Sequence, residues 1–322
     1  MPKNLVKFNA GSGPHRAQKI KNEIKRILKY WTPERIKNAK PFQSYRVGKP
    51  LKKKLTTLDS FTTNPLPDNL VPPFSGIGHL TMTFNSIGDQ QGTAWCVANN
   101  VILTAGHCLF QGNEMAHNVL FYPCYNNEPG QIPNPTGPAI PILDRWVHPD
   151  YAASHPAGNQ TDKQISCDIG ACHTSSPMFP RSIPSIKLVK KWTVNVGSSI
   201  HMDGYPAEPV SGYPFDGNHM WDCYDKIISN GDKIYSSHGN LTGGSSGGPW
   251  IFNVDANTWV ALGLTSCNNS TPSDPSCTQM YSPISAQTNN LENAFNEISS
   301  WLEPGETFMV DPFPQNHNFK RK

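Results

Sequence analysis

Long hydrophobic runs are missing from this sequence. No stretch of about 18 apolar residues occurs in its 322 residues, so we expect no transmembrane helix and no stable insertion into a membrane. The first residues, MPKNLVKFNAGSGPHRAQK, also lack the apolar segment of a secretory signal peptide. An exported form would therefore begin after a removed signal or use another route.

The usual sequence patterns for metal and nucleic-acid binding are missing as well. The chain has no C-x2-C pairs with clustered histidines, the pattern of a structural zinc site, and its basic residues form no RNP-like or zinc-finger pattern. We therefore expect no metal, no organic cofactor and no nucleic-acid partner.

Acidic residues are scarce at the front of the chain. Residues 1–54 contain 16 Lys and Arg but only Glu23 and Glu34, whereas the rest contains 11 basic and 22 acidic residues out of totals of 27 and 24. Such a front could bind nucleic acid or an anionic membrane, or it could dock on the chain's own acidic part.

Within this front, residues 15–31 predict an amphipathic helix with lysines and arginines opposite its apolar face. The apolar residues at helical spacing are Ile20, Ile24, Ile27, Leu28 and Trp31. We expect the helix to pack on the protein's own surface, with membrane contact as the alternative. Residues 32–75 are rich in Pro, Thr and Lys and are typical of an exposed connector open to cleavage.

From about residue 76, short apolar runs are separated by Gly, Pro, Asn and Asp. With 16% charged residues, 25 Gly and 30 Pro, this texture predicts an all-β sandwich or barrel. The predicted strands are His79–Phe84, Gly92–Val97, Val101–Thr104, Val119–Tyr122, Ile186–Val189, Ser199–Met202, Trp250–Val254 and Trp259–Leu264. A closing helix is expected over residues 290–302, followed by a polar tail over residues 304–322.

Eight cysteines and several N-x-[ST] acceptors favour an oxidising, extracellular setting. Short sequence separations suggest disulfides between Cys96 and Cys108 and between Cys267 and Cys277. The pairing of the other four, Cys124, Cys167, Cys172 and Cys223, stays open.

The segment TGGSSGGPW at residues 242–250 sets two serines between four glycines. A flexible linker is disfavoured, because Pro-Trp-Ile-Phe follows at once and predicts a buried strand. Read as G-x-S-x-G, the segment makes Ser245 a nucleophile whose acid and histidine follow it in sequence. Read as G-x-S-G-G-P, it makes Ser246 the nucleophile, with histidine and aspartate upstream.

The upstream partners decide for Ser246. Only His317 follows the serines, whereas the string T-A-G-H-C presents His107 after a β-branched strand. The orienting acid must be buried, and Asp168 lies among small and apolar residues in C-D-I-G-A-C. The order His107, Asp168, Ser246 disfavours an α/β-type esterase, which would also need strands alternating with long helices.

These motifs resemble the trypsin-like serine peptidases of the chymotrypsin fold, closest to the glutamyl-endopeptidase-like and secreted microbial branch. The resemblance rests on T-A-G-H-C, D-I-G, G-Y-P at residues 204–206 and G-G-S-S-G-G-P-W, and it covers residues 30–41 and about 76–302. It implies two six-stranded antiparallel β-barrels with a C-terminal helix over residues 76–303. Residues 1–75 would be a basic N-terminal prosegment with its connector.

The resemblance also implies roles around the nucleophile. The backbone N–H groups of Gly244 and Ser246 would form an oxyanion hole. The specificity pocket would be lined by residues 237–243 and 264–268, with Thr242, Gly243, Thr265 and Ser266 as substrate contacts.

The chain departs from related enzymes at two positions. Ser245 stands where trypsin-like zymogens commonly carry an Asp that pairs with a new N-terminus, so a detachable prosegment is the alternative means of control. Thr265 stands where glutamyl endopeptidases place a histidine, so specificity for glutamate is not supported. A neutral pocket follows, because no Asp precedes Ser246 within six positions.

The sequence therefore predicts a secreted, monomeric serine endopeptidase that acts on proteins or peptides through an acyl-enzyme. The alternative is an inactive peptidase homologue that serves as a binding module.

Overall fold

The protein was studied as a computed structural model. It describes residues 4–42, 44, 46, 61–66, 70–126, 139–154, 156, 159–176, 183–190, 195–210, 212–230, 234–255, 258–268, 279–283 and 291–311.

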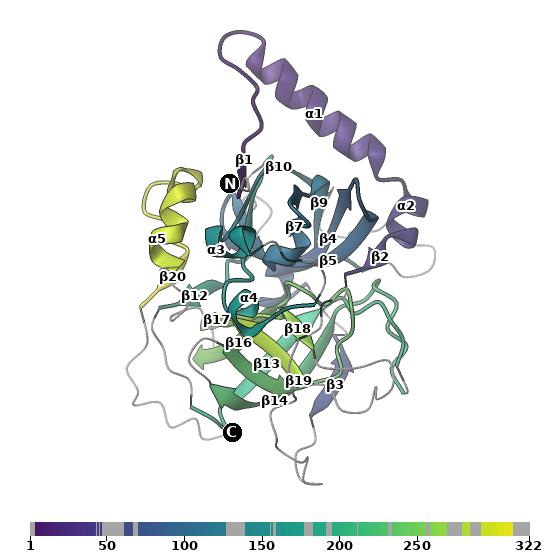
Figure 1. The fold of residues 1–322 in the computed structure, drawn as a ribbon, viewed down its shortest axis with the longest axis vertical. Coiled ribbons are helices and arrows are strands. Elements are labelled where there is room, and N and C mark those ends of the chain that lie inside the picture. Colours follow the sequence, from purple (N-terminus) through teal and green to yellow (C-terminus); the bar gives the residue numbers. More distant parts are fainter. Residues whose placement is uncertain are drawn as a thin grey trace.

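The basic front docks on the chain's own surface. Helix α1 (Arg16–Tyr30) confirms the predicted helix and leads into the short α2 (Pro33–Asn38), and α1 lies over the first sheet (Figure 1). Ile27 and Trp31 are buried, and the Trp31 indole N–H donates to the carbonyl of Asn118. Arg35 forms an ion pair of 3.0 Å with Asp89. Basic residues of the front thus meet acidic residues of the body.

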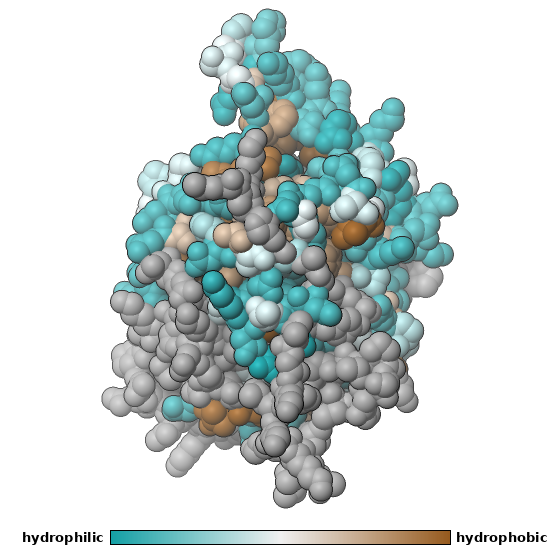
Figure 2. All heavy atoms as spheres, viewed as in Figure 1, coloured by the Kyte–Doolittle hydropathy of each residue, from teal (hydrophilic) through white to brown (hydrophobic). Residues whose placement is uncertain are grey.

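The front and the residues that follow it also add strands to the body. Strand β1 (Leu5–Val6) pairs with β10 of the first sheet, β2 (Lys40–Pro41) pairs with β5, and β3 (Thr62–Pro65) pairs with β14 of the second sheet. The surface over α1 is largely hydrophilic, and hydrophobic side chains come into view where the helix meets the body (Figure 2). Residues before position 76 are therefore built into both halves of the protein.

The first sheet closes into a six-stranded antiparallel barrel. Its order is β10-β11-β6-β5-β4-β9, and β9 pairs again with β10. The barrel strands are β4 (Ile77–Phe84), β5 (Gly88–Ala98), β6 (Val101–Thr104), β9 (His117–Pro123), β10 (Ile140–Val147) and β11 (Gly170–Thr174). A small hairpin of β7 (Phe110–Gln111) and β8 (Glu114–Met115) and two short helices, α3 (Pro149–Ala153) and α4 (Asp162–Ile165), lie in its connections.

Strand β5 is buried from Gln90 to Ala98, because one of its faces lines the barrel interior while the other is covered by the rest of the molecule. Trp95, Leu103 and Phe121 fill the core and are fully buried. A barrel with such a core is a rigid support for the turns at its ends.

The second sheet forms the lower half of the molecule in Figure 1. Its order is β18-β19-β15-β14-β13-β16-β17-β12-β20, with β3 beside β14. The strands are β12 (Lys187–Val189), β13 (Ser199–Gly204), β14 (Trp221–Asn230), β15 (Ile234–His238), β16 (Pro249–Asp255), β17 (Thr258–Leu264), β18 (Cys267–Asn268), β19 (Gln279–Pro283) and β20 (Met309–Val310). Its separate core holds Ile200, Met202, Trp250 and Leu262. The all-β prediction is confirmed.

The closing helix is shorter than the predicted span. Helix α5 (Leu291–Phe295) continues as a 3-10 helix over Asn296–Trp301, and the Phe295 ring lies 5.5 Å from that of Trp146 in β10. Beyond it, residue Met309 is buried in β20, which pairs in parallel with β12. Part of the stretch expected to be a polar tail is therefore a strand of the second sheet.

Candidate active site

A tight turn at the end of β6 presents His107. Residues Gly106–Cys108 form a 3-10 turn directly after the strand. A Cβ at position 106 would lie 3.0 Å from the Tyr151 ring and 3.1 Å from the Asp168 carboxylate, so glycine allows the close approach that brings His107 onto Asp168. The side chains of His107 and Asp168 are both 0% exposed.

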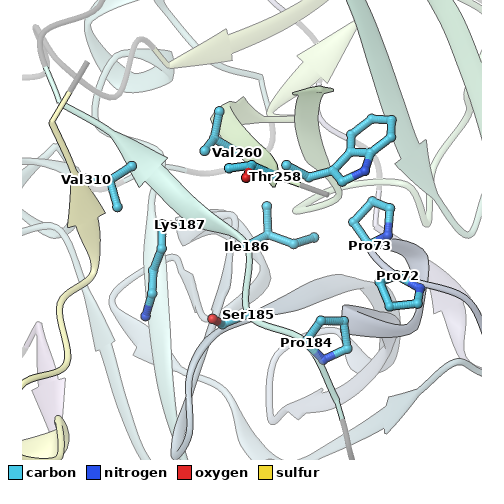
Figure 3. A pocket seen from close by; sticks show the side chains of 10 residues that line it. Pro72, Pro73, Pro184, Ser185, Ile186, Lys187, Thr258, Val260 and Val310 are labelled. Atoms are coloured by element: carbon cyan, nitrogen blue, oxygen red, sulfur yellow. The ribbon is translucent and has the colours of Figure 1, made fainter. Parts of the chain in front are cut away.

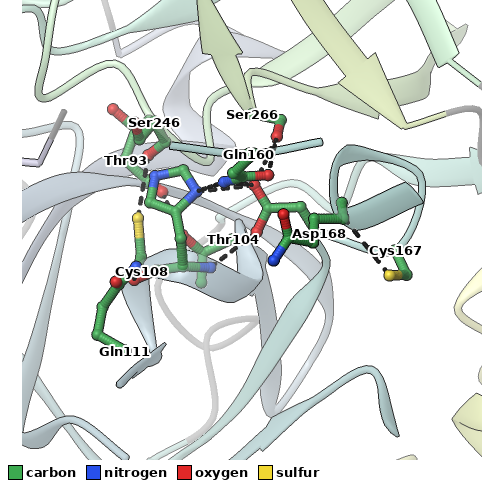
Figure 4. Close-up of polar contacts among 11 residues, drawn as sticks. Thr93, Thr104, Cys108, Gln111, Gln160, Cys167, Asp168, Ser246 and Ser266 are labelled. Carbon is green, nitrogen blue, oxygen red and sulfur yellow. Dashed lines mark hydrogen bonds and ion pairs between the residues drawn. The ribbon is translucent and has the colours of Figure 1, made fainter. Parts of the chain in front are cut away.

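The Asp168 carboxylate accepts four hydrogen bonds. Its Oδ2 lies 2.7 Å from His107 Nδ1, and its Oδ1 accepts from the His107 backbone N–H at 2.7 Å. Gln160 Nε2 donates to Oδ2 at 3.0 Å and Ser266 Oγ at 2.5 Å, and both side chains converge on the carboxylate in Figure 4. Together these four hydrogen bonds fix the position and the plane of the buried carboxylate.

Gln160 is the residue that sequence reasoning missed in this network. It lies in a loop before α4, and a lone glutamine outside a motif carries no sequence signal. Ser266 was predicted as a substrate contact, and the structure shows that its hydroxyl donates to Asp168. It therefore links the second half of the chain to the acid supplied by the first half.

Electrostatics set the protonation of His107. Burial alone would lower the pKa of its imidazole, but the neighbouring Asp168 carboxylate more than offsets this and raises the pKa to about 10. Within the part of the chain that is described, the His107 Nε2 atom is buried without a hydrogen-bond partner. The imidazole thus holds a proton against Asp168 and leaves its other nitrogen unused.

The two adjacent serines have different environments. Ser245 Oγ donates to the Thr242 carbonyl at 2.7 Å, and its backbone N–H contacts the same carbonyl at 3.2 Å. Ser246 is anchored through its own carbonyl, which accepts from the Thr93 N–H of β5 at 2.8 Å. The Ser245 hydroxyl is therefore hydrogen-bonded within the turn. Ser246 is held through its backbone carbonyl and not through its hydroxyl.

Two glycines shape the serine loop. Gly244 and Gly247 have φ angles of +97° and +87°, a backbone region that favours glycine. A Cβ at Gly247 would lie 2.2 Å from Thr104 Oγ1 and 2.3 Å from the Thr93 carbonyl. The loop can therefore lie against the first barrel only with glycine at this position.

The predicted oxyanion-hole donor Gly244 already has an acceptor. Its N–H donates to the Phe42 carbonyl at 3.3 Å, and the Phe42 ring lies 4.9 Å from the His107 ring. Phe42 belongs to the basic front and is only 5% exposed. No sequence pattern pointed to a residue of the front at this place.

The remaining predicted substrate contacts help to hold the loop. Thr242 Oγ1 donates to the Glu208 carbonyl at 2.9 Å, and the Gly243 carbonyl accepts from the Ala207 N–H at 2.8 Å. Thr265 Oγ1 accepts from the Trp250 indole at 3.1 Å, and its carbonyl accepts from the Gly247 N–H at 2.8 Å.

The predicted Cys96–Cys108 disulfide is wrong, because both thiols are free. Cys96 Sγ donates to the Ala98 carbonyl at 3.2 Å, whereas Cys108 Sγ lies 3.7 Å from the Ser246 carbonyl. The position of β5 that faces Cys108 is Gly92, whose added Cβ would lie 3.0 Å from that sulfur. Short separation in sequence did not reveal which strand position meets the turn.

The second predicted pairing, Cys267 with Cys277, lies partly outside the described residues. Cys267 carries a free, buried thiol, and Cys277 lies outside the described residues. Burial raises the pKa of the thiols of Cys96 and Cys172, so both stay protonated and unreactive.

A separate cavity of about 230 Å³ lies away from these residues. It is lined by Pro72–Pro73, residues 184–187, Thr258–Val260 and Val310, which are largely proline and aliphatic side chains (Figure 3). It shares no lining residue with the His107 and Ser246 region.

Within the described ranges, no helix is long and apolar enough to cross a bilayer.

Comparison with known proteins adds evidence on the fold. A thermostable serine protease, AL20, from an extremophilic microorganism is 21% identical, with a TM-score of 0.56, and the match covers 70% of this chain and 97% of that one. The protease Anisep from Arthrobacter nicotinovorans is 21% identical, with a TM-score of 0.55 and coverages of 70% and 96%. The chain has the chymotrypsin-like serine protease fold. The predicted resemblance is thereby confirmed at the level of the fold.

A glutamyl endopeptidase structure is a third match, 16% identical, with a TM-score of 0.56 and coverages of 74% and 96%. No protein-family profile matches the chain, and no curated protein matches it in sequence. The serine-protease likeness therefore rests on three-dimensional structure and on the short motifs around His107, Asp168 and Ser246.

Proposed function

We propose that this protein is a serine endopeptidase whose catalytic residues are His107, Asp168 and Ser246. The observation that supports it best is the buried His107–Asp168 pair, 2.7 Å between Nδ1 and Oδ2. The adjacent Cys108 sulfur lies 3.7 Å from the Ser246 carbonyl, and the hydroxyl of the neighbouring Ser245 donates to Thr242. In this fold, the arrangement matches the roles of base, orienting acid and nucleophile.

In the proposed reaction, Ser246 Oγ attacks a peptide carbonyl while His107 Nε2 takes its proton. The N–H groups of Gly244 and Ser246 stabilise the oxyanion that develops, a contribution of about 3 kcal/mol for one such donor. His107 then gives the proton to the leaving amine, and water hydrolyses the acyl-enzyme by the same steps. Asp168 holds the imidazole so that Nδ1 carries the other proton.

Gln160 and Ser266 act as positioning residues in this scheme. Each donates a hydrogen bond to Asp168 Oδ2, which fixes the plane of the carboxylate relative to the imidazole. The proposed substrates are proteins or peptides, and the proposed enzyme is an exported monomer that needs no cofactor. Peptide mapping of Asn159 and Asn268 for glycans would test export, and gel filtration would test the monomeric state. Asn240 is buried and is expected to carry no glycan.

Fluorophosphonate labelling tests the proposed catalytic serine. The wild type, Ser246→Ala and Ser245→Ala are compared as full-length chains and after limited tryptic digestion, for which the Lys52-Lys53-Lys54 sequence offers a target. Loss of label in Ser246→Ala alone supports the proposal. If no form takes up label, including a chain in which Phe42→Ala uncovers His107 and Gly244, the protein is an inactive homologue, and the binding-module alternative replaces the peptidase.

A further inference from the structure

Five described residues of the N-terminal front, Lys40, Pro41, Phe42, Ser44 and Arg46, contact both halves of the molecule at the candidate active site. Strand β2 lies alongside β5 (Figure 1), with Lys40 opposite Gln90 and Pro41 opposite Gln91 in a parallel pair. The Phe42 N–H continues this pairing by donating to the Gln91 carbonyl at 3.0 Å. The segment therefore enters the site on the side of the first barrel.

Phe42 occupies the centre of the site. Its carbonyl accepts from the Gly244 N–H at 3.3 Å, and its ring packs 4.9 Å from the His107 ring and 6.2 Å from that of Phe84. The Phe42 ring thus covers His107, the proposed base, and its carbonyl accepts from Gly244, a proposed oxyanion-hole donor. With it in place, His107 and Ser246 are only 0% and 5% exposed.

The segment leaves along the second sheet. The Ser44 carbonyl accepts from the Asn268 N–H at 3.3 Å, and the Arg46 N–H donates to the Asn268 carbonyl at 3.1 Å. Asn268 thus bonds through its N–H and its carbonyl to two residues that are two positions apart. This is the hydrogen-bond pattern of a parallel pair of strands. The Arg46 side chain also holds both carboxylate oxygens of Asp162, at 2.5 and 2.8 Å.

The direction of the segment is opposite to that of a cleavable peptide. Because the specificity pocket is expected to include residues 264–268, the acyl part of a substrate would lie along Asn268. The leaving amine would then lie on the first-barrel side, where His107 can protonate it. Here the N-terminal end, Lys40–Pro41, lies on the first-barrel side, and Arg46 lies along Asn268.

We propose that the stretch containing Lys40, Pro41, Phe42, Ser44 and Arg46 is a built-in inhibitor that covers the candidate active site in the direction opposite to a substrate. The inference rests on the proposed peptidase function. The chain that follows the Phe42 carbonyl leads toward Asn268 and away from the side where a leaving amine would be protonated. The segment therefore blocks the site without being cut there.

The chemistry of the closed site agrees with this arrangement. The raised pKa of His107 keeps the imidazole protonated at neutral pH, so it cannot accept the proton of Ser246. The His107 Nε2 atom has no hydrogen-bond partner among the described residues, and the Phe42 ring packs against that imidazole. Removing Phe42 would uncover the imidazole and free the Gly244 N–H for a substrate carbonyl.

Point variants of the full-length chain test the inference, because β1, β2 and α1 are built into the fold. Phe42→Ala is expected to raise the hydrolysis rate of a fluorogenic peptide by about tenfold or more. Tenfold corresponds to a loss of roughly 1.4 kcal/mol in the binding of this stretch to the active site. Arg46→Ala, which removes a partly exposed ion pair, should raise it by about threefold. Lys37→Ala, which removes an exposed charge in α2, is the matched control and should change nothing.

A synthetic peptide spanning residues 38–48 tests the direction. Added to the Phe42→Ala chain, it should inhibit hydrolysis and be recovered intact, whereas the same peptide with alanine at position 42 should inhibit at least about tenfold more weakly. Cleavage of the peptide after Phe42 would overturn the reversed orientation.

The outcomes separate this inference from the proposed function. If wild type and Phe42→Ala hydrolyse the reporter equally fast, the peptidase function stands and the inhibitor is overturned. If no variant hydrolyses peptide or takes up fluorophosphonate while all of them unfold cooperatively, the peptidase function fails, and the inhibitor fails with it.

Discussion

The two halves of the candidate active site are held in place by different means. In the first barrel, polar side chains hold the site, since Asp168 accepts four hydrogen bonds inside a region from which solvent is excluded. In the second sheet, backbone geometry holds the site, since Gly244 and Gly247 adopt positive φ angles and the loop bonds through its carbonyls.

This difference predicts how each half fails. A buried carboxylate can be replaced by a side chain of the same shape. Substitutions in the first half should therefore reduce catalytic activity more than they reduce the stability of the fold. A loop that needs glycine has no room for a Cβ, so the second half should lose structure first. The predictions below follow this contrast from the largest expected effect to the smallest.

Asp168→Asn should reduce kcat about 10⁴-fold, measured in a chain that also carries Phe42→Ala so that the cleft is open. The amide cannot accept all the hydrogen bonds that converge on the carboxylate, and it favours the wrong imidazole tautomer. Steady-state hydrolysis measures the effect. The exposed carboxylate of Asp150 provides the control, and an equal loss in Asp150→Asn would show that the buried pair is not special.

Gly247→Ala should lower the free energy of unfolding by about 3 kcal/mol or more, because its Cβ would collide with Thr104 and Thr93. Gly112→Ala is the matched control, since Gly112 also has a positive φ, +52°, but has no atom within 4 Å of an added Cβ. There the cost should be only about 1 kcal/mol. Denaturant unfolding of both variants decides, and equal costs would remove the role assigned to close packing.

Two buried histidines in the first barrel should give the stability a maximum near neutral pH. Burial lowers the pKa of His79 to about 4, despite its hydrogen bond to Gln91, so the unfolded chain binds the extra proton as pH falls from 6.5 to 4. Stability should then fall by up to about 3 kcal/mol. His107, whose pKa is raised to about 10, stabilises the fold fully below pH 6.5, and this is lost as pH rises toward 10.

Unfolding free energies measured from pH 4 to pH 10 test both arms of this profile. His79→Gln should flatten the acid arm and leave the alkaline arm, whereas His107→Gln should do the reverse. The two assignments fail if either variant leaves its own arm unchanged.

Gly92→Cys should form a disulfide with Cys108, because the new Cβ would lie 3.0 Å from the Cys108 sulfur. About the same distance separates a Cβ from the far sulfur in a relaxed disulfide. The closed loop should stabilise the oxidised over the reduced protein by about 2 kcal/mol. Thiol titration and thermal unfolding with and without reductant measure the effect, and adding Cys108→Ala should abolish it.

Ser266→Ala should reduce kcat/KM about tenfold, the smallest of these effects, because it removes one of several donors to Asp168. A positioning role predicts that the apparent pKa of His107 in the pH–rate profile also moves. Thr242→Ser, which keeps a hydroxyl at a loop contact, serves as the control. An unchanged profile would leave Ser266 with a packing role only.

Much of the site follows from local sequence patterns. The strings T-A-G-H-C and G-G-S-S-G-G-P predicted the turn that presents His107 and the loop that carries Ser246, because small residues and glycines are required wherever backbone must approach closely. Asp168 followed from its apolar neighbours. Strand and helix positions were predicted from the spacing of apolar residues, although the closing helix ends as a 3-10 helix.

Other features depend on which distant segments meet. The cysteine pairing failed because the register of β5 places Gly92, and not Cys96, opposite Cys108. Gln160 could not be found, since its function depends on a contact with a carboxylate that the fold brings to it.

The sequence by itself determined the all-β architecture and the basic front, and it singled out His107, Asp168 and Ser246 as candidates, because each depends on residue type and short spacing. Tertiary structure alone decided that Gln160 and Ser266 hold the acid, that Cys96 and Cys108 stay apart, and that Phe42 covers the site. Ser266 meets Asp168 across 98 positions of the chain, and Phe42 meets His107 and Gly244 from the N-terminal front. Gln160 and Cys96 lie nearer in sequence to Asp168 and Cys108, but local patterns carry no information about the register in which such segments meet.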